Sequence, residues 1–246
     1  MDCPPGMKNE PDECLQLGKT IYGLVQAAIQ WWKKLVTIMR KIGFKGGYSD
    51  PCLMTRRYAL GIIFIALYVD DCLCVGHTAA IKDTIEQLKV NGLEVTVEDK
   101  LTDYLSCEIN FSKNKKKAWL GQPHLLLNLE KKFGKTVEKL QTYRTPGTPG
   151  VGILRPETEE EKISDEEQSE YRTCVGMLLY LVMHSRPDIA DAARELSKSV
   201  DGATYASLKE MRRIIKFILN TKEWGLKIEP KPEWQDWYIV VFCDSD

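Results

Sequence analysis

The sequence is poor in the residues that build zinc centres. It has three histidines, far apart along the chain, and none of its eight cysteines forms a C-x-x-C pair. A zinc cluster is therefore not predicted. Cys72 and Cys74 follow one another at strand spacing in an apolar run, which favours reduced thiols in the core and a reducing, intracellular setting.

Long apolar runs and an excess of one charge are also missing. No window of eighteen uncharged apolar residues occurs, and Met1–Met7 contains no apolar signal core, so no membrane partner is expected. The formal net charge is −1, whereas nucleic-acid-binding domains are usually basic. A local basic patch can still bind nucleic acid on a chain whose net charge is close to zero. The most basic stretch, Lys113–Lys117, is either a solvated hairpin tip or a phosphate contact.

What is present is a chain of 246 residues, 43% of them hydrophobic, enough for one large or two ordinary domains with a buried core. Hydrophobic periodicity predicts a first half rich in strands and a second half rich in helices. Helices are predicted at 24–42, 79–91, 124–133, 170–183, 187–200 and 204–221, and strands at 51–55, 59–75 (a hairpin), 93–97, 104–112, 118–120 and 237–246. Residues 143–152 and 157–167 are expected to be a connector and an acidic loop.

Single residues in these segments have ordinary structural interpretations. Trp31 and Trp32 belong to the apolar stripe of the first helix, which favours core packing over base stacking. Thr78 is the expected N-cap of the second helix. Arg186 and Asp188 flank a proline that suits a helix start, so we expect them to cap and orient that helix.

The most informative stretch is Gly61–Gly76, where a run of Ile, Leu, Phe, Tyr and Val leads into Asp70 and Asp71, and the apolar Cys72–Val75 follows. This pattern predicts a β-hairpin with the aspartates at its bend. Between apolar walls, two adjacent carboxylates would need a cation to stay ionised, and Mg²⁺ or Mn²⁺ accepts oxygen ligands. The alternative is a solvated turn, in which aspartate is common.

The tetrapeptide Tyr68–Asp71, Y-V-D-D, resembles the Y-x-D-D box of reverse transcriptases, specifically that of copia-type retrotransposons. Further similar boxes occur in the family's order and cover almost the whole chain. With the family's pattern in parentheses after each segment of this chain, they are Lys19–Ala27 with Gln30-Trp31 (K-S-L-Y-G-L-K-Q-A-P-R-Q-W), Leu105–Ile109 (L-G-x-E-I), Leu120–Gln122 (L-S-Q), Tyr171–Tyr180 (Y-R-x-x-V-G-x-L-x-Y) and Ser185–Ala190 (T-R-P-D-I-A).

The resemblance implies an RNA-directed DNA polymerase with an α+β fold. A palm-like antiparallel sheet with helices on one face would be followed by a mostly helical thumb or connection region. The implied regions are 1–122 (partial fingers and palm), 123–235 (helical thumb or connection) and 236–246 (first strand of a truncated RNase H-like domain). In that last region Asp244 would be the first acid of a nonfunctional nuclease site.

The resemblance also implies a chemistry, because two divalent ions assist the in-line attack of a primer 3′-hydroxyl on a deoxynucleotide. Asp70 and Asp71 would be the catalytic metal ligands, for Mg²⁺ or Mn²⁺. The partners would be an RNA or DNA template with its primer, a deoxynucleotide and the remainder of the polyprotein. The residues placed beside nucleotide, template and primer end are Tyr22, Gly23, Gln26, Tyr68 and Val69, and those that grip the primer are Leu120, Gly121 and Gln122.

The sequence departs from the family pattern in two places. Val25, Ala28 and Ile29 replace the usual Lys and Pro-Arg, which removes two positive charges. The family's third aspartate, in a D-V-K-x-A-F-L strand, has no match, because Asp2 and Asp12 flank prolines. We therefore expect this piece of a polyprotein to bind metal weakly and to polymerise little or not at all. We expect it to be intracellular, in cytoplasmic virus-like particles.

Three alternatives remain open. The first is a non-catalytic nucleic-acid-binding remnant of the same polyprotein. The second is another palm-like enzyme such as a nucleotidyl cyclase, which is disfavoured because no G-G-D/E-E-F-like turn occurs. The third is a chain that does not fold stably, which a cooperative melt would exclude.

Overall fold

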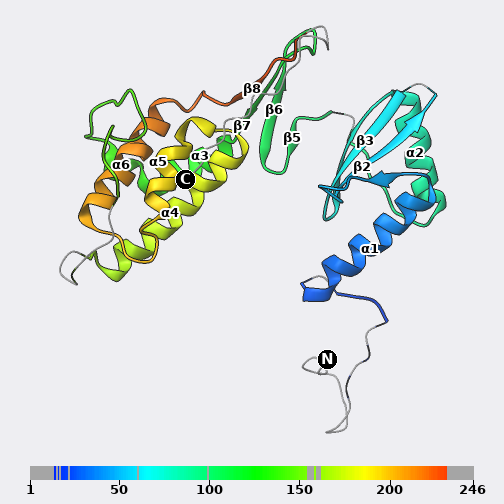
Figure 1. Ribbon diagram of the computed structural model, residues 1–246, viewed down its shortest axis with the longest axis horizontal. Coiled ribbons are helices and arrows are strands. Elements are labelled where there is room, and N and C mark those ends of the chain that lie inside the picture. Colours follow the sequence, from blue (N-terminus) through cyan, green and yellow to red (C-terminus); the bar gives the residue numbers. More distant parts are fainter. Residues whose placement is uncertain are drawn as a thin grey trace. The chain divides into compact units, whose positions relative to one another are not determined.

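The computed structural model describes residues 14, 16, 18–21, 23–59, 61–98, 100–153, 158 and 162–231 (Figure 1). The chain divides into two compact units, Met1–Glu98 and Asp99–Asp246. The described residues form an α+β structure whose strand pairs are all antiparallel. None of the helices in this described part is long and apolar enough to cross a membrane. The division into partial palm, thumb and nuclease strand stays a prediction.

The first unit is a four-stranded sheet with two helices. The sheet order is β1-β2-β3-β4, and β3 and β4 form the predicted hairpin. The elements are α1 (Val25–Lys41), β1 (Lys45–Gly46), β2 (Leu53–Tyr58), β3 (Gly61–Tyr68), β4 (Asp71–Val75) and α2 (Thr78–Val90).

One face of this sheet carries the core. Ile63, Ile65 and Leu67 alternate along β3 and are buried with Leu35 and Met39 of α1. Trp31 and Trp32 are partly buried and pack against the same cluster, so the predicted core packing of both rings is confirmed. The helices therefore cover one face of the sheet and leave the other face open.

Two local predictions in this unit were wrong. The N-cap of α2 is His77 rather than Thr78, because the extended His77 directs its Nδ1 to accept from the Ala79 amide at 3.3 Å. Residues 93–97 form no strand. Their alternation reflects Leu93 and Val95, which pack against the first core without pairing to another strand.

The second unit joins a β-ribbon to a helical bundle. Its sheet order is β5-β6-β7-β8, with β6 and β7 paired as predicted, and Figure 1 shows β6, β7 and β8 projecting from the helices. The elements are β5 (Asp103–Tyr104), β6 (Cys107–Phe111), β7 (Ala118–Gly121), α3 (Pro123–Val137), α4 (Asp165–His184), η2 (Pro187–Ile189), α5 (Ala190–Ser197), α6 (Tyr205–Asn220) and β8 (Leu226–Ile228).

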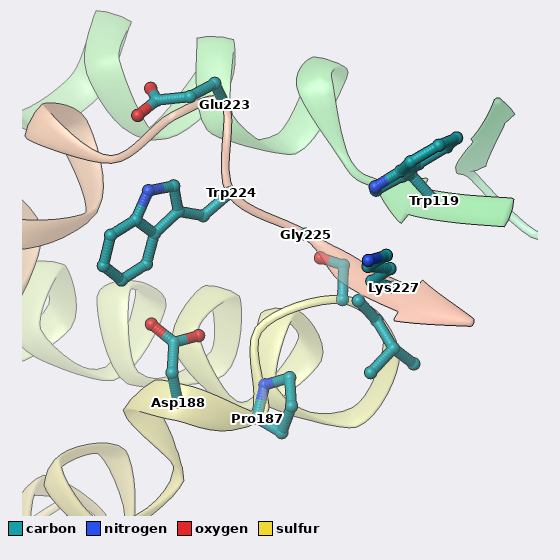
Figure 2. Close-up of a pocket in the computed structure, with 9 residues that line it drawn as sticks. Trp119, Pro187, Asp188, Glu223, Trp224, Gly225 and Lys227 are labelled. Carbon is teal, nitrogen blue, oxygen red and sulfur yellow. The ribbon is translucent and has the colours of Figure 1, made fainter. Parts of the chain in front are cut away.

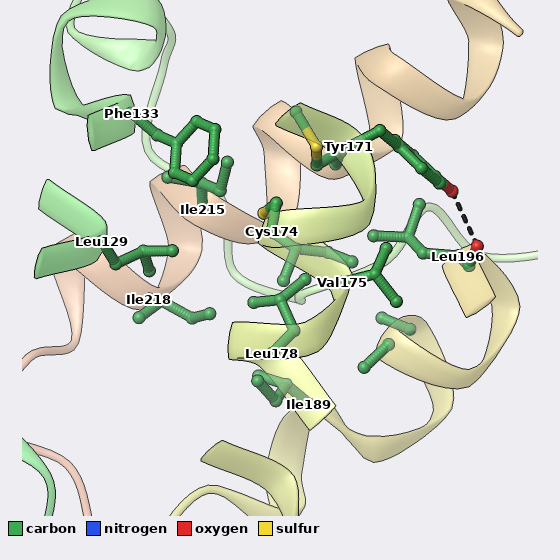
Figure 3. Close-up of a cluster of buried hydrophobic side chains, with 14 of the residues drawn as sticks. Leu129, Phe133, Tyr171, Cys174, Val175, Leu178, Ile189, Leu196, Ile215 and Ile218 are labelled. Atoms are coloured by element: carbon green, nitrogen blue, oxygen red, sulfur yellow. Dashed lines mark hydrogen bonds between the residues drawn. The ribbon is translucent and has the colours of Figure 1, made fainter. Parts of the chain in front are cut away.

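The bundle packs its helices around α4. Leu178 of α4 is fully buried with Leu129 of α3 and Ile215 of α6 (Figure 3). Leu181 of α4 is fully buried in the same cluster. The Tyr171 hydroxyl donates to the Leu196 carbonyl at 2.7 Å, which satisfies the polar end of a buried ring.

The bundle also corrects two boundaries. Asp165, Glu166 and Glu167 form the first turn of α4 instead of an acidic loop, because Ser164 makes a capping box with Glu167 and acidic residues suit a helix N-terminus. The expected helix 187–200 is shorter, a 3₁₀ turn (η2) followed by α5.

The prediction that Arg186 and Asp188 cap the helix start was wrong, because Arg186 stands at the N-cap position of η2 but no side chain there caps a backbone amide. The buried Arg186 guanidinium donates twice to Asp188, at 2.8 Å each, and also to the carbonyl and hydroxyl oxygens of Thr221. Arg186 thus ties η2 to the end of α6. The predicted strand 237–246, with Asp244, lies outside the described residues.

Candidate functional site

The candidate site is the tip of the β3–β4 hairpin. Tyr68 pairs directly with Asp71, so Val69 and Asp70 form a two-residue turn between the strands. Asp71 is the first residue of β4, and both aspartates are exposed. The hairpin predicted from the sequence, with the acidic pair at its bend, is therefore confirmed.

The turn is strained and fixed from outside. Val69 has φ +48°, a left-handed conformation that is unusual for a β-branched residue and costs on the order of 1–3 kcal/mol. The Trp31 indole N–H, on α1, donates to the Val69 carbonyl at 2.7 Å. The helix that precedes the sheet thus holds the tip of the hairpin in place.

Strand register places Asp71 on the open face of the sheet. Because Ile63, Ile65 and Leu67 point to the core, Tyr68 points to the opposite face. Asp71 lies directly across from Tyr68 and shares that face. Tyr68 is 57% exposed, so an aromatic ring and a carboxylate stand together on an uncovered surface.

The electrostatics of the tip differ from the expectation of apolar walls. In water, two carboxylates repel by only about 1 kcal/mol at 4 Å, and both aspartates are exposed. The pair therefore does not require a cation, although its oxygens are the donors that Mg²⁺ prefers. Within the described residues, no three His, Cys, Asp or Glu side chains form a group that could hold a metal ion.

Cys72 follows the acidic pair but adds no charge to it. Desolvation, with smaller contributions from Cys74 and Asp71, raises the pKa of the Cys72 thiol to about 11. At neutral pH the side chain is therefore a protonated thiol. Such a group is soft and is not a ligand for a hard cation.

Two of the other residues expected near the nucleotide, Gly23 and Gln26, lie at the start of α1. Gly23 has φ +93°, which suits glycine, and Gln26 is exposed on the first turn. No hydrogen bond or ion pair among the described residues joins them to the aspartates. Tyr22 lies outside the described residues. The roles of all three stay predictions.

The residues expected to grip the primer belong to the second unit. Leu120 and Gly121 end β7, and the Gln122 side chain is only 1% exposed. The Gln122 Oε1 accepts from the Ser185 hydroxyl at 2.7 Å, which links the start of α3 to the end of α4. The buried amide is therefore a structural link, and the primer contact of this segment stays a prediction.

The contact that sequence reasoning missed is that of Trp31 with the turn. Its stripe position explained core burial but not the direction of the indole N–H. The available signal was Gln30-Trp31, which forms part of the family-like box beside Y-V-D-D. That box placed the first helix near the hairpin without identifying the donor.

Comparisons with known proteins identify the family of this chain. The family model described as reverse transcriptase (RNA-dependent DNA polymerase) matches residues 1–145. The putative transposon Ty5-1 protein YCL074W of Saccharomyces cerevisiae is 26% identical over 246 residues, 98% of this chain and 76% of that protein. No solved structure matches.

Longer polyproteins match as well. The Pol polyprotein from transposon RE2 of Arabidopsis thaliana is 29% identical over 229 residues, and that from transposon TNT 1-94 of Nicotiana tabacum is 26% identical over 213 residues. The matches cover 92% and 84% of this chain but span only 15% and 16% of those polyproteins. By its family match and its relatives, the chain belongs to the reverse transcriptase (RNA-dependent DNA polymerase) family of copia-type retrotransposon Pol polyproteins.

Proposed function

We propose that this chain supplies the palm surface of a reverse transcriptase, on which Asp70 and Asp71 bind divalent metal. The observation that carries the proposal is the placement of Asp71 beside Tyr68 on the open sheet face, at a turn fixed by Trp31. An exposed aromatic ring can support the primer end, and carboxylate oxygens suit Mg²⁺ or Mn²⁺. The partners are a template–primer and a deoxynucleotide.

The metal ions would supply the charge that activates the primer 3′-hydroxyl and stabilises the leaving pyrophosphate. The protein's own part is to hold two exposed carboxylates in fixed positions at the tip of the hairpin. The Trp31 indole and the strained Val69 backbone provide that fixation. Because catalytic geometry tolerates only small displacements, a fixed tip suits this role.

We further propose that the 246-residue polypeptide binds metal weakly and polymerises little by itself. Two-metal sites need several carboxylates, and the described residues bring two acidic side chains to the tip without a third. The prediction concerns this polypeptide in isolation.

Metal binding to the tip can be tested with Mn²⁺, whose free form is quantified by electron paramagnetic resonance. The unmodified chain should bind Mn²⁺ weakly, and Asp70→Asn or Asp71→Asn should abolish that binding. Asp191→Asn is the matched control, because Asp191 is 88% exposed on α5 in the other unit. Binding that survives both tip substitutions would refute the assignment of the metal ligands.

Template–primer binding tests the function itself. At constant ionic strength, Mg²⁺ should tighten the binding of a labelled RNA–DNA primer–template, and Asp70→Asn should remove the increment while leaving metal-free binding intact. A polymerisation assay with the same substrate should give at most trace extension. If Mg²⁺ does not change the affinity of the unmodified chain for the primer–template, the catalytic proposal is overturned.

The exposed lysines of the β6–β7 hairpin favour one alternative, a non-catalytic nucleic-acid-binding protein. Lys113, Lys115 and Lys116 are all exposed at its tip. Such a protein would bind nucleic acid with a strong dependence on salt and none on Mg²⁺. The same titrations therefore separate the two functions.

A further inference from the structure

The connector between α3 and α4, residues 143–152, contains the dipeptide Thr-Pro twice, as Thr145-Pro146 and Thr148-Pro149. This segment forms neither helix nor strand, and Thr145 is exposed whereas Thr148 is half-buried. Proline-directed kinases phosphorylate a serine or threonine that a proline follows. The sequence therefore offers two equivalent acceptors, and only their surroundings distinguish them.

The side chain beside Thr145 is a cation. The Nη2 of Arg213, on α6, donates to the Thr145 hydroxyl oxygen at 3.0 Å. The guanidinium carbon lies 4.3 Å from the centroid of the Tyr143 ring, a cation–π contact that holds the plane of the group in place. Thr145 thus stands against an arginine whose position the connector itself fixes.

Arg213 has a donor to spare. Its Nε–H is buried and has no hydrogen-bond partner among the described residues, although buried donors are normally paired. Nε and Nη2 lie on one edge of the planar guanidinium, and together they form the fork that binds two oxygens of a carboxylate or a phosphate. The fork of Arg213 is therefore half-filled.

A filled fork occurs elsewhere in the same unit. The Nε and Nη2 of Arg186 donate to the two carboxylate oxygens of Asp188, at 2.8 Å each. Asp188 lines a pocket of about 350 Å³, and Figure 2 shows its carboxylate. At Arg213 the same two nitrogens meet only the neutral hydroxyl of Thr145. An anionic group attached to that hydroxyl would complete the fork.

An acidic side chain of α6 distinguishes the second threonine from the first. The Glu210 carboxylate accepts from the Thr148 amide at 3.2 Å and from the Thr148 hydroxyl at 2.8 Å. A phosphate on Thr148 would stand against this carboxylate, and two like charges in contact repel one another. On α5, Glu195 is already paired with Lys198 at 2.6 Å. The charges around the connector therefore favour a phosphate on Thr145 alone.

We propose that Thr145 is a phosphorylation site whose phosphate is bound by Arg213, which fastens the connector to α6. The Thr145 Oγ1 attacks the γ-phosphorus of ATP held by a proline-directed kinase. The bond from that phosphorus to the bridging oxygen breaks, ADP leaves, and the hydroxyl proton passes to the base of the kinase. The proposal goes beyond the metal site and does not depend on it, because every residue that it uses lies in the second unit.

Site selection is tested by incubating the full chain with ATP and a purified proline-directed kinase, with the two sites separated by fragmentation mass spectrometry. Thr145 should be phosphorylated about tenfold faster than Thr148, the ratio for about 1.4 kcal/mol of repulsion by Glu210. Glu210→Gln should raise the rate at Thr148 and leave that at Thr145 unchanged. No phosphate on Thr145, or equal rates at the two threonines in the unmodified chain, would overturn the proposal.

Phosphate binding by Arg213 is tested on the phosphorylated chain by ³¹P nuclear magnetic resonance. A cation beside the phosphate favours the dianion, so the second pKa of phosphothreonine, ordinarily about 6, should be about one unit lower in the unmodified chain than in Arg213→Gln. Arg212→Gln is the matched control, because Arg212 is the adjacent, exposed arginine of α6, and it should keep the low pKa. Equal pKa values in the two variants would refute the role of Arg213.

A measurement without substitutions covers an Arg213 variant that does not fold. The Thr148 amide, which donates to Glu210, reports docking of the connector on α6. Phosphorylation of the unmodified chain should slow hydrogen exchange of this amide about tenfold, which corresponds to about 1.4 kcal/mol, and unchanged or faster exchange would contradict the proposal. Asp70→Asn should behave as the unmodified chain does, so failure of the metal site and failure of this site remain distinguishable.

Discussion

The sharpest prediction concerns the indole that fixes the acidic turn. Trp31→Phe removes the N–H that donates to the Val69 carbonyl at 2.7 Å and keeps most of the ring that packs on the core. The net contribution of such a hydrogen bond is about 0.5–1.5 kcal/mol. Because water can reach the exposed carbonyl, we expect a loss of about 1 kcal/mol.

This loss should act mainly on the tip. The left-handed Val69 conformation costs on the order of 1–3 kcal/mol, and the Trp31 bond helps to offset that cost. Without the bond, other turn conformations become populated, and the two carboxylates spend less time in the metal-binding arrangement. About 1 kcal/mol corresponds to a roughly fivefold fall in Mn²⁺ affinity.

The assay combines Mn²⁺ titration with urea unfolding. Trp32→Phe is the matched control, because Trp32 is the adjacent partly buried ring on the same core. Both substitutions should lower stability to a similar small extent, whereas only Trp31→Phe should lower Mn²⁺ affinity. The Trp31 indole proton, identified by its absence from the Trp31→Phe spectrum, should also show the small temperature coefficient of a bonded N–H. Equal affinity losses in the two variants would refute the reasoning.

Four other single-residue features have consequences that can be measured. Val69→Gly relieves the left-handed strain and should raise the free energy of unfolding by about 1 kcal/mol in urea titrations. Arg186→Met leaves the partly buried Asp188 unpaired and should cost about 2–4 kcal/mol, without rescue by Arg186→Lys, which cannot make the bidentate contact. Gly225→Ala places a Cβ against the Leu120 carbonyl, so hydrogen exchange should show loss of the β7–β8 pairing. The pKa of the Cys72 thiol is raised to about 11, so the reactive thiolate is scarce at neutral pH. The rate of Cys72 alkylation, followed by mass spectrometry, should therefore rise about tenfold for each pH unit until the pH reaches this pKa.

The elements with strong periodicity were predictable from the sequence. The stripe that includes Leu35 and Met39 predicted α1, and the continuous apolar run through Ile63, Ile65 and Leu67 predicted β3. The acidic pair marked the bend between two apolar runs. In each case the local pattern and the buried face agree, which is why sequence alone sufficed.

Contacts between distant segments were not predictable from local pattern. The strand β8 has three exposed residues and no alternation of apolar and polar burial, and only its pairing with β7, about a hundred residues earlier, makes it a strand. The link from Gln122 to Ser185 likewise depends on how α3 and α4 pack. At residues 93–97 the alternation itself misled, because Leu93 and Val95 are covered without strand pairing.

The metal site and the solvated turn, the two interpretations of the acidic pair, place different demands on the turn between β3 and β4. A merely solvated two-residue turn is formed without strain by glycine or asparagine at the left-handed position. This chain instead places a β-branched valine there and holds it with an indole from another element. Backbone strain that is stabilised from outside is characteristic of functional sites. The fixed turn also sets Asp71 on the open sheet face beside Tyr68, and the proposed metal binding would account for these features, which a solvated loop leaves without a cause.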